Sequence, residues 1–98
     1  MAQFDVYRMA DGELVLDVQT DLLGSFDSRL VVPLMPVADA PVRHPRLNPA
    51  VTIDGQSYVM VTQFMIAVDR PELGSRVDNL DRYYDQIKLA YDMIFNGF

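Results

Sequence analysis

The chain has 98 residues, half of them apolar, with fourteen acidic and eight basic side chains and no cysteine. This predicts one domain over residues 1–98, with material for a single core. The net charge of -6 disfavours direct nucleic-acid binding, and the lack of cysteine excludes disulfides and thiolate metal sites. With no membrane-span or signal-peptide pattern in the sequence, we expect a cytoplasmic protein without a membrane partner.

The N-terminal part alternates apolar and polar residues, as half-buried strands do. Residues 3–8 place Phe4 and Val6 on one face and Asp5 and Tyr7 on the other. Asp11-Gly12 suits the positive φ angles of a tight turn, and the alternation resumes over residues 13–19. The sequence therefore predicts a hairpin.

Residues 20–25 break this alternation and carry the adjacent pair Leu22 and Leu23 in a connection. The next segment, residues 29–35, is the most continuous apolar run and predicts a central strand. Because proline donates no ladder hydrogen bond, Pro33 predicts a bulge, a bend or a passage between two sheets.

The second half begins with a proline-punctuated surface loop over residues 37–48. Asp54-Gly55 then marks the turn of a second hairpin, and residues 65–68 suggest one further short strand. From Leu80 onward the apolar residues recur every three or four positions, which predicts an amphipathic helix. Gly97 is a suitable stop. The predicted apolar stripe of this helix is Leu80, Tyr83, Tyr84, Ile87, Ala90, Tyr91, Ile94 and Phe98. The candidate N-caps of the helix are Asp78, Asn79 and Asp81. The fold class is mainly β with one C-terminal helix.

Few residues suggest catalysis. The single His44 lies in the polar loop, and the sequence contains no phosphate-binding loop, nucleophile elbow or histidine-rich metal spacing. Asp17 and Asp21 are close enough in sequence to hold a cation, although capping of a strand end explains them more simply. We therefore expect a protein that binds another protein, with no catalytic residue, no cofactor and no metal.

Two features are candidates for partner binding. Leu22 and Leu23 either plug the core beneath them or form an exposed knob. At the other end of the chain, bulky residues continue to the last position, although termini are usually polar. Phe95 lies off the core stripe of the helix. Phe95 and Phe98 are therefore either covered by a dimer partner or displayed as an aromatic anchor.

The sequence also resembles a known family, the CcdB toxins of bacterial toxin-antitoxin modules, along most of its length. The likeness is carried by residues 3–7, 17–23, 29–34, 60–65 and 93–98. It implies an SH3-like barrel or antiparallel sheet core with a long C-terminal helix, assembled as a homodimer. It also implies a toxin that binds the A subunit of DNA gyrase and traps the cleavage complex.

In that family a CcdA-like antitoxin neutralises the toxin, and the two together repress their own operon, so DNA is contacted only indirectly. The residues at the family's gyrase-contact positions are Leu22, Leu23, Asp92, Phe95, Asn96, Gly97 and Phe98. The best-known members carry a tryptophan where this chain has Asn96.

Two alternatives remain open. The fold implied by the resemblance is shared with the MazF and Kid toxins, which cut RNA, so an endoribonuclease is one alternative. The net acidity of the chain weighs against it. The other is a non-toxic paralogue that still binds an antitoxin, which Asn96 favours because an aromatic contact is lost.

Overall fold

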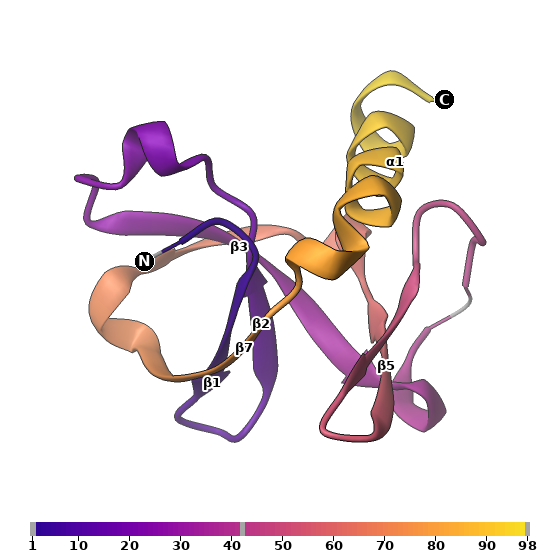
Figure 1. The fold of residues 1–98 in the computed structure, drawn as a ribbon, viewed down its shortest axis with the longest axis horizontal. Coiled ribbons are helices and arrows are strands. Elements are labelled where there is room, and N and C mark those ends of the chain that lie inside the picture. Colours follow the sequence, from indigo (N-terminus) through magenta and orange to yellow (C-terminus); the bar gives the residue numbers. More distant parts are fainter. Residues whose placement is uncertain (1, 42, 98) are drawn as a thin grey trace.

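The computed structural model describes residues 2–41 and 43–97. In this part of the chain it confirms the predicted class, strands followed by one α-helix (Figure 1). The strands are β1 (Asp5–Met9), β2 (Leu14–Asp17), β3 (Ser28–Pro36), β4 (Ala50–Ile53), β5 (Gln56–Met60), β6 (Ile66–Asp69) and β7 (Leu73–Asn79). The helices are α1 (Tyr84–Asn96) and the 3-10 turns η1 (Asp21–Leu23), η2 (Val37–Asp39), η3 (Thr62–Phe64), η4 (Arg70–Glu72) and η5 (Asp81–Tyr83). No helix among the described residues has the length and apolar character needed to cross a membrane.

The strands form one antiparallel sheet that curls into a half-barrel. Its order is β4-β5-β3-β2-β1-β7, and β6 lies beside β3. β3 changes partner along its length, because residues 28–31 pair with β6 and residues 34–36 pair with β5. Pro33 lies between the two halves, and its carbonyl accepts a hydrogen bond from the Val61 amide at 2.9 Å. Of the irregularities predicted near Pro33, the structure shows a change of partner within one sheet, and not a passage between two sheets.

Both predicted hairpin turns are confirmed. Gly12 has a φ of 88°, between β1 and β2. In the turn between β4 and β5, Asp54 and Gly55 have φ angles of 55° and 76°. These left-handed conformations explain the glycine of both turns and Asp54 of the second, because glycine and, less readily, aspartate tolerate them. In the first turn Asp11 contributes through its side chain, whose Oδ1 accepts the Glu13 amide at 3.0 Å.

The sheet is buried on both faces near its centre. The main core lies inside the half-barrel and is closed by α1; its buried members include Val6, Leu16, Met60, Leu80 and Ile87. A smaller cluster of Tyr7, Val15 and Val31 lies on the opposite face. The expectation that β1 is only half-buried is therefore wrong, because partly buried side chains from β6 and β7 cover its second face.

The helix begins later than predicted. Leu80 is fully buried but precedes η5, and regular α-helix starts at Tyr84. Asn79 ends β7, and its Oδ1 accepts the Asp81 amide at 2.9 Å, but the residue at the N-cap position of η5 is Leu80, which makes no side-chain cap hydrogen bond. Tyr84 was predicted to lie on the buried stripe of the helix, but its side chain is 48% exposed. Its ring packs edge-on against Phe4 at a centroid distance of 5.8 Å.

The predicted stop of the helix is confirmed. Gly97 adopts a left-handed φ of 79°, and its amide donates to the Met93 carbonyl at 3.1 Å. This is the usual arrangement of a helix C-cap glycine.

Candidate partner-contact site

The connection between β2 and β3 forms an exposed knob. Two backbone hydrogen bonds form the turn η1: the Leu23 amide donates to the Thr20 carbonyl and the Gly24 amide to the Asp21 carbonyl, both at 3.1 Å. The Leu22 side chain is 91% exposed and that of Leu23 39% exposed. The sequence left open whether these leucines plug the core or form an exposed knob, and the core plug is wrong for Leu22.

The same loop contains an apolar residue that sequence reasoning missed. Phe26 follows η1 and is 52% exposed. An aromatic residue between Ser25 and Asp27, in an otherwise polar turn, was the available signal. The knob therefore presents three large apolar side chains, those of Leu22, Leu23 and Phe26.

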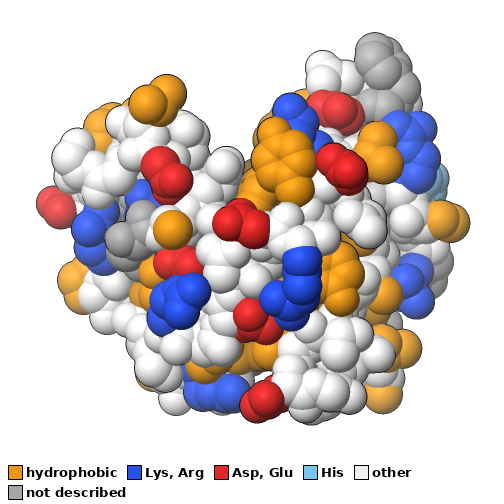
Figure 2. All heavy atoms as spheres, viewed as in Figure 1, with side chains coloured by type: hydrophobic (Ala, Val, Ile, Leu, Met, Phe, Trp, Pro, Cys, Tyr) orange, Lys and Arg blue, Asp and Glu red, His pale blue; other side chains and the backbone are white. Residues whose placement is uncertain are grey.

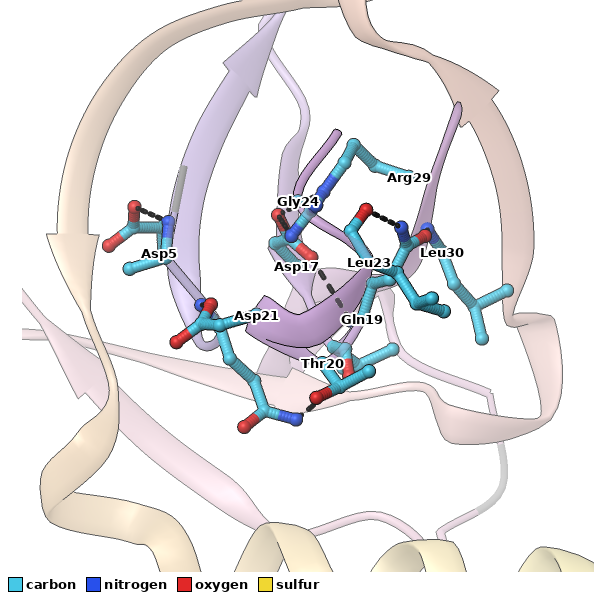
Figure 3. A network of polar contacts seen from close by, with 12 residues as sticks. Asp5, Asp17, Gln19, Thr20, Asp21, Leu23, Gly24, Arg29 and Leu30 are labelled. Carbon is cyan, nitrogen blue, oxygen red and sulfur yellow. Dashed lines mark hydrogen bonds and ion pairs between the residues drawn. The ribbon is translucent and has the colours of Figure 1, made fainter. Parts of the chain in front are cut away.

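Side-chain amides and carboxylates fix the knob where the chain enters it (Figure 3). Gln19 Nε2 donates to the Leu23 carbonyl at 3.1 Å, while Gln19 Oε1 accepts the Leu30 amide at 3.0 Å. Asp21 Oδ1 accepts the Gln3 amide at 2.7 Å. One glutamine therefore links the knob to β3, and one aspartate links it to the N-terminal segment.

A buried ion pair lies behind these contacts. Arg29 Nε and Nη2 both lie 2.8 Å from Asp17 Oδ2, and neither side chain is exposed to solvent. Asp17 Oδ1 also accepts the Gln19 amide at 3.0 Å. Burial raises the pKa of Asp17, and the hydrogen bonds from Arg29 and Gln19 oppose that rise. Asp17 is thus engaged by Arg29, and Asp21 by Gln3, so the possible shared cation site receives no support from this geometry.

A second polar cluster surrounds Asp5 on β1. Its carboxylate accepts hydrogen bonds from Tyr7 Oη at 3.2 Å, Arg76 Nε at 2.9 Å and Asn79 Nδ2 at 2.9 Å. Burial alone would raise the pKa of Asp5, but the bonds from Asn79 and Arg76 hold it below its usual value. Burial and the neighbouring Asp5 raise the pKa of Tyr7 to about 12.

The C-terminal end of α1 carries the other predicted contact residues. Ile87 and Ala90 are fully buried and fix the helix on the sheet. Tyr91 Oη donates to the Val18 carbonyl at 3.2 Å, and burial raises the pKa of Tyr91. Beyond this anchor, Phe95 is 69% exposed. Of the remaining predicted positions, Asp92 is half-buried, Asn96 and Gly97 are exposed, and Phe98 lies outside the described residues.

The knob and the end of α1 stand on the same side of the molecule, as two separate projections (Figure 1). Figure 2 shows the surface hollowed between them. The predicted contact residues are therefore brought to one side of the chain but not into one continuous patch. The Tyr91–Val18 hydrogen bond fixes the position of α1 relative to the end of β2, from which the knob begins.

The curled antiparallel sheet and the C-terminal helix place the chain in the CcdB/MazF-like fold class. A solved structure titled "Endoribonuclease from Mycobacterial species" is similar at a TM-score of 0.77 and 16% sequence identity, covering 95% of this chain and 88% of the other. At that identity the likeness concerns the fold alone. The family model described as CcdB protein matches residues 3–97, and the chain therefore belongs to the CcdB family, a family of toxins from toxin-antitoxin systems.

Proposed function

We propose that this chain is a gyrase-directed toxin. Its dimer binds the A subunit of DNA gyrase and traps the cleavage complex, and a CcdA-like antitoxin neutralises it and joins it in repressing their operon. The contact residues are Leu22 and Leu23 of the knob, with Asp92, Phe95, Asn96, Gly97 and Phe98 at the end of the helix.

The observation that carries this proposal is the exposure of large apolar side chains on fixed backbone at two family positions. Leu22 is 91% exposed and Phe95 69% exposed, on two projections of the same side. Leaving such surface in water forgoes about 25 cal/mol for each Å² that burial would remove. Contacts of this kind become favourable when a partner covers them, and aromatic residues are frequent among the strongest interface contacts.

The test uses the purified chain, gyrase and plasmid DNA, with trapped cleavage complex and affinity for the A subunit as readouts. Leu22→Ser and Phe95→Ala are expected to weaken binding roughly tenfold or more each, because each removes over 1 kcal/mol of apolar contact. The control is Val37→Ser, since Val37 is also exposed, at 46%, but lies on η2 outside the proposed site. A wild-type chain that neither binds the A subunit nor traps cleaved DNA would refute the proposal.

Asn96 offers a second measurement. Its side chain is exposed at the end of α1, where an indole would be free to stack on an arginine of the partner. Such a contact contributes about 0.5–2 kcal/mol, so Asn96→Trp is expected to raise gyrase affinity roughly two- to thirtyfold. An unchanged affinity would argue that the end of the helix does not meet gyrase. A toxin inactive in both forms that still binds its antitoxin would favour the non-toxic paralogue.

The endoribonuclease alternative is motivated by the fold of the similar structure, and the charges of this chain argue against it. A groove of about 480 Å³ on the described surface combines Arg8 with three acidic residues, Asp11, Glu13 and Asp39. This excess of negative charge repels the RNA backbone. Arg29 is fully buried against Asp17 and does not reach a substrate. Site-specific fragments from cellular RNA treated with the pure chain would reverse this ranking.

A further inference from the structure

The chain leaves the knob through residues 24–27, and Arg70 of η4 lies against this segment. Arg70 Nη2 donates to the Phe26 carbonyl at 2.7 Å and also to the Gly24 carbonyl. The Arg70 backbone amide donates to the Asp27 carbonyl at 2.6 Å. One residue therefore binds three carbonyls of the segment from more than forty positions further along the chain.

The position of Arg70 follows from the sheet. β6 pairs with the start of β3, with Asp69 opposite Ser28, so the next residue along the chain meets the segment that leads into β3. η4 then turns the chain away, and Glu72 Oε2 accepts the Asp69 amide at 3.3 Å. The guanidinium is not simply solvated, since its Nε is buried and has no hydrogen-bond partner among the described residues. The half-buried Arg70 guanidinium thus makes its polar contacts with the Gly24 and Phe26 carbonyls, both through Nη2.

The knob depends on such contacts because it has little packing of its own. None of the three residues of η1 is buried, and a single 3-10 turn has few internal hydrogen bonds. Exposed segments with few buried contacts open locally at low free-energy cost. Gln3 and Gln19 hold the side where the chain enters the knob, and Arg70 holds the side where it leaves.

We propose that Arg70 is a positioning residue for the partner contact, holding the knob so that Leu22 and Leu23 are presented in one orientation. This rests on the proposed function. Arg70 need not touch the partner. It raises the fraction of molecules in the binding-competent conformation, and the apparent dissociation constant rises in inverse proportion as that fraction falls.

The experiment compares the full chain with Arg70→Met and Arg70→Lys. The control is Arg46→Met, which makes the same charge change at an exposed arginine whose side chain has no hydrogen bond to the described residues. Affinity for the gyrase A subunit is measured beside amide hydrogen exchange of Leu23, Gly24 and Phe26.

Arg70→Met is expected to weaken binding roughly tenfold, as if nine molecules in ten had left the competent state, and to accelerate exchange in the knob by a similar factor. Arg70→Lys is expected to recover part of both effects, because an ammonium group binds a carbonyl but does not reproduce the planar guanidinium. The control is expected to leave both unchanged.

Core amides distinguish positioning from general destabilisation. The Val61 and Leu80 amides serve as reporters, because they donate to the Pro33 and Phe4 carbonyls away from the knob. If their exchange rises as much as exchange in the knob, the positioning role is refuted. Unchanged knob exchange in Arg70→Met also refutes it. A wild-type chain that fails to bind gyrase refutes only the proposed function, because faster knob exchange in Arg70→Met still supports the hold of Arg70 on the loop.

Discussion

Arg29→Met tests the buried ion pair behind the knob. Methionine keeps the apolar stem of the side chain but leaves the Asp17 carboxylate fully buried, with the Gln19 amide as its remaining hydrogen bond. Breaking a buried pair by removing one partner costs about 3–5 kcal/mol, a large share of the roughly 5–15 kcal/mol that keeps a small domain folded. With a slope of about 1.5 kcal/mol per molar urea, the unfolding midpoint falls by roughly 2 to 3 M.

The assay is urea unfolding followed by far-UV circular dichroism and tyrosine fluorescence, because the chain has five tyrosines and no tryptophan. Arg76→Met is the matched control, since Arg76 pairs with Asp5 through a side chain that is 56% exposed. Its midpoint is expected to move much less. Combining Asp17→Leu with Arg29→Met removes both charges and is expected to restore most of the lost stability.

The same variant has a pH signature. Without Arg29, burial raises the pKa of Asp17 further, so the folded chain binds a proton more readily than the unfolded chain. Stability that depends on this group is then present at low pH and is lost as the pH rises through the raised pKa. The gap between wild type and Arg29→Met is expected to narrow from pH 8 toward pH 5. A midpoint loss below about 0.5 M, or a gap that widens on acidification, would contradict the reasoning.

Two further predictions concern the sheet. Because burial and the neighbouring Asp5 raise the pKa of Tyr7 from 10.0 to about 12, the contribution of Tyr7 to stability is present below pH 10 and is lost as the pH rises to about 12. Tyr7→Phe should therefore abolish this part of the alkaline stability loss, which amounts to at most about 3 kcal/mol and is measured by urea unfolding. An alkaline profile that is unaltered in Tyr7→Phe would contradict the prediction. Gly74→Ala should destabilise by about 1–3 kcal/mol or more, because the new Cβ would lie 2.2 Å from the Arg8 carbonyl oxygen on β1. Ser75→Ala is its control in thermal unfolding, and equal losses at the two positions would refute the close approach.

Local chemistry was sufficient to predict the parts of the fold that depend on neighbouring residues. Asp11-Gly12 and Asp54-Gly55 predicted the positions of both hairpin turns, because the ability of glycine to adopt a positive φ depends on the residue itself and not on distant contacts. Pro33 located the partner change in β3 for a similarly local reason.

β7 was missed because its sequence, LGSRVDN, is polar and contains glycine. Its strand conformation comes from pairing with β1, about seventy residues earlier, and from the close approach at Gly74. No local pattern records either contact. The same limit explains why Asp78 and Asn79, read as helix caps, lie at the end of β7.

The candidate site was predictable only in part for a related reason. Exposed apolar residues in a connection and at a chain end stand out in a sequence, and the structure exposes Leu22 and Phe95. The residues that hold the knob do not stand out. Gln19 resembles any polar residue at a strand end, and Arg70 meets the knob only because β6 pairs with β3.

In the proposed function, the residues that hold the knob connect the buried core to the leucines that would meet the partner. An exposed leucine on a mobile loop would lose much of its binding free energy to ordering. Here the knob is connected through Gln19 to Asp17 and then to the buried Arg29, so part of the ordering takes place when the chain folds. It follows that substitutions at Asp17 or Arg29, which lie out of reach of any partner, should weaken partner binding as well as stability. Substitutions at Leu22 should change binding alone.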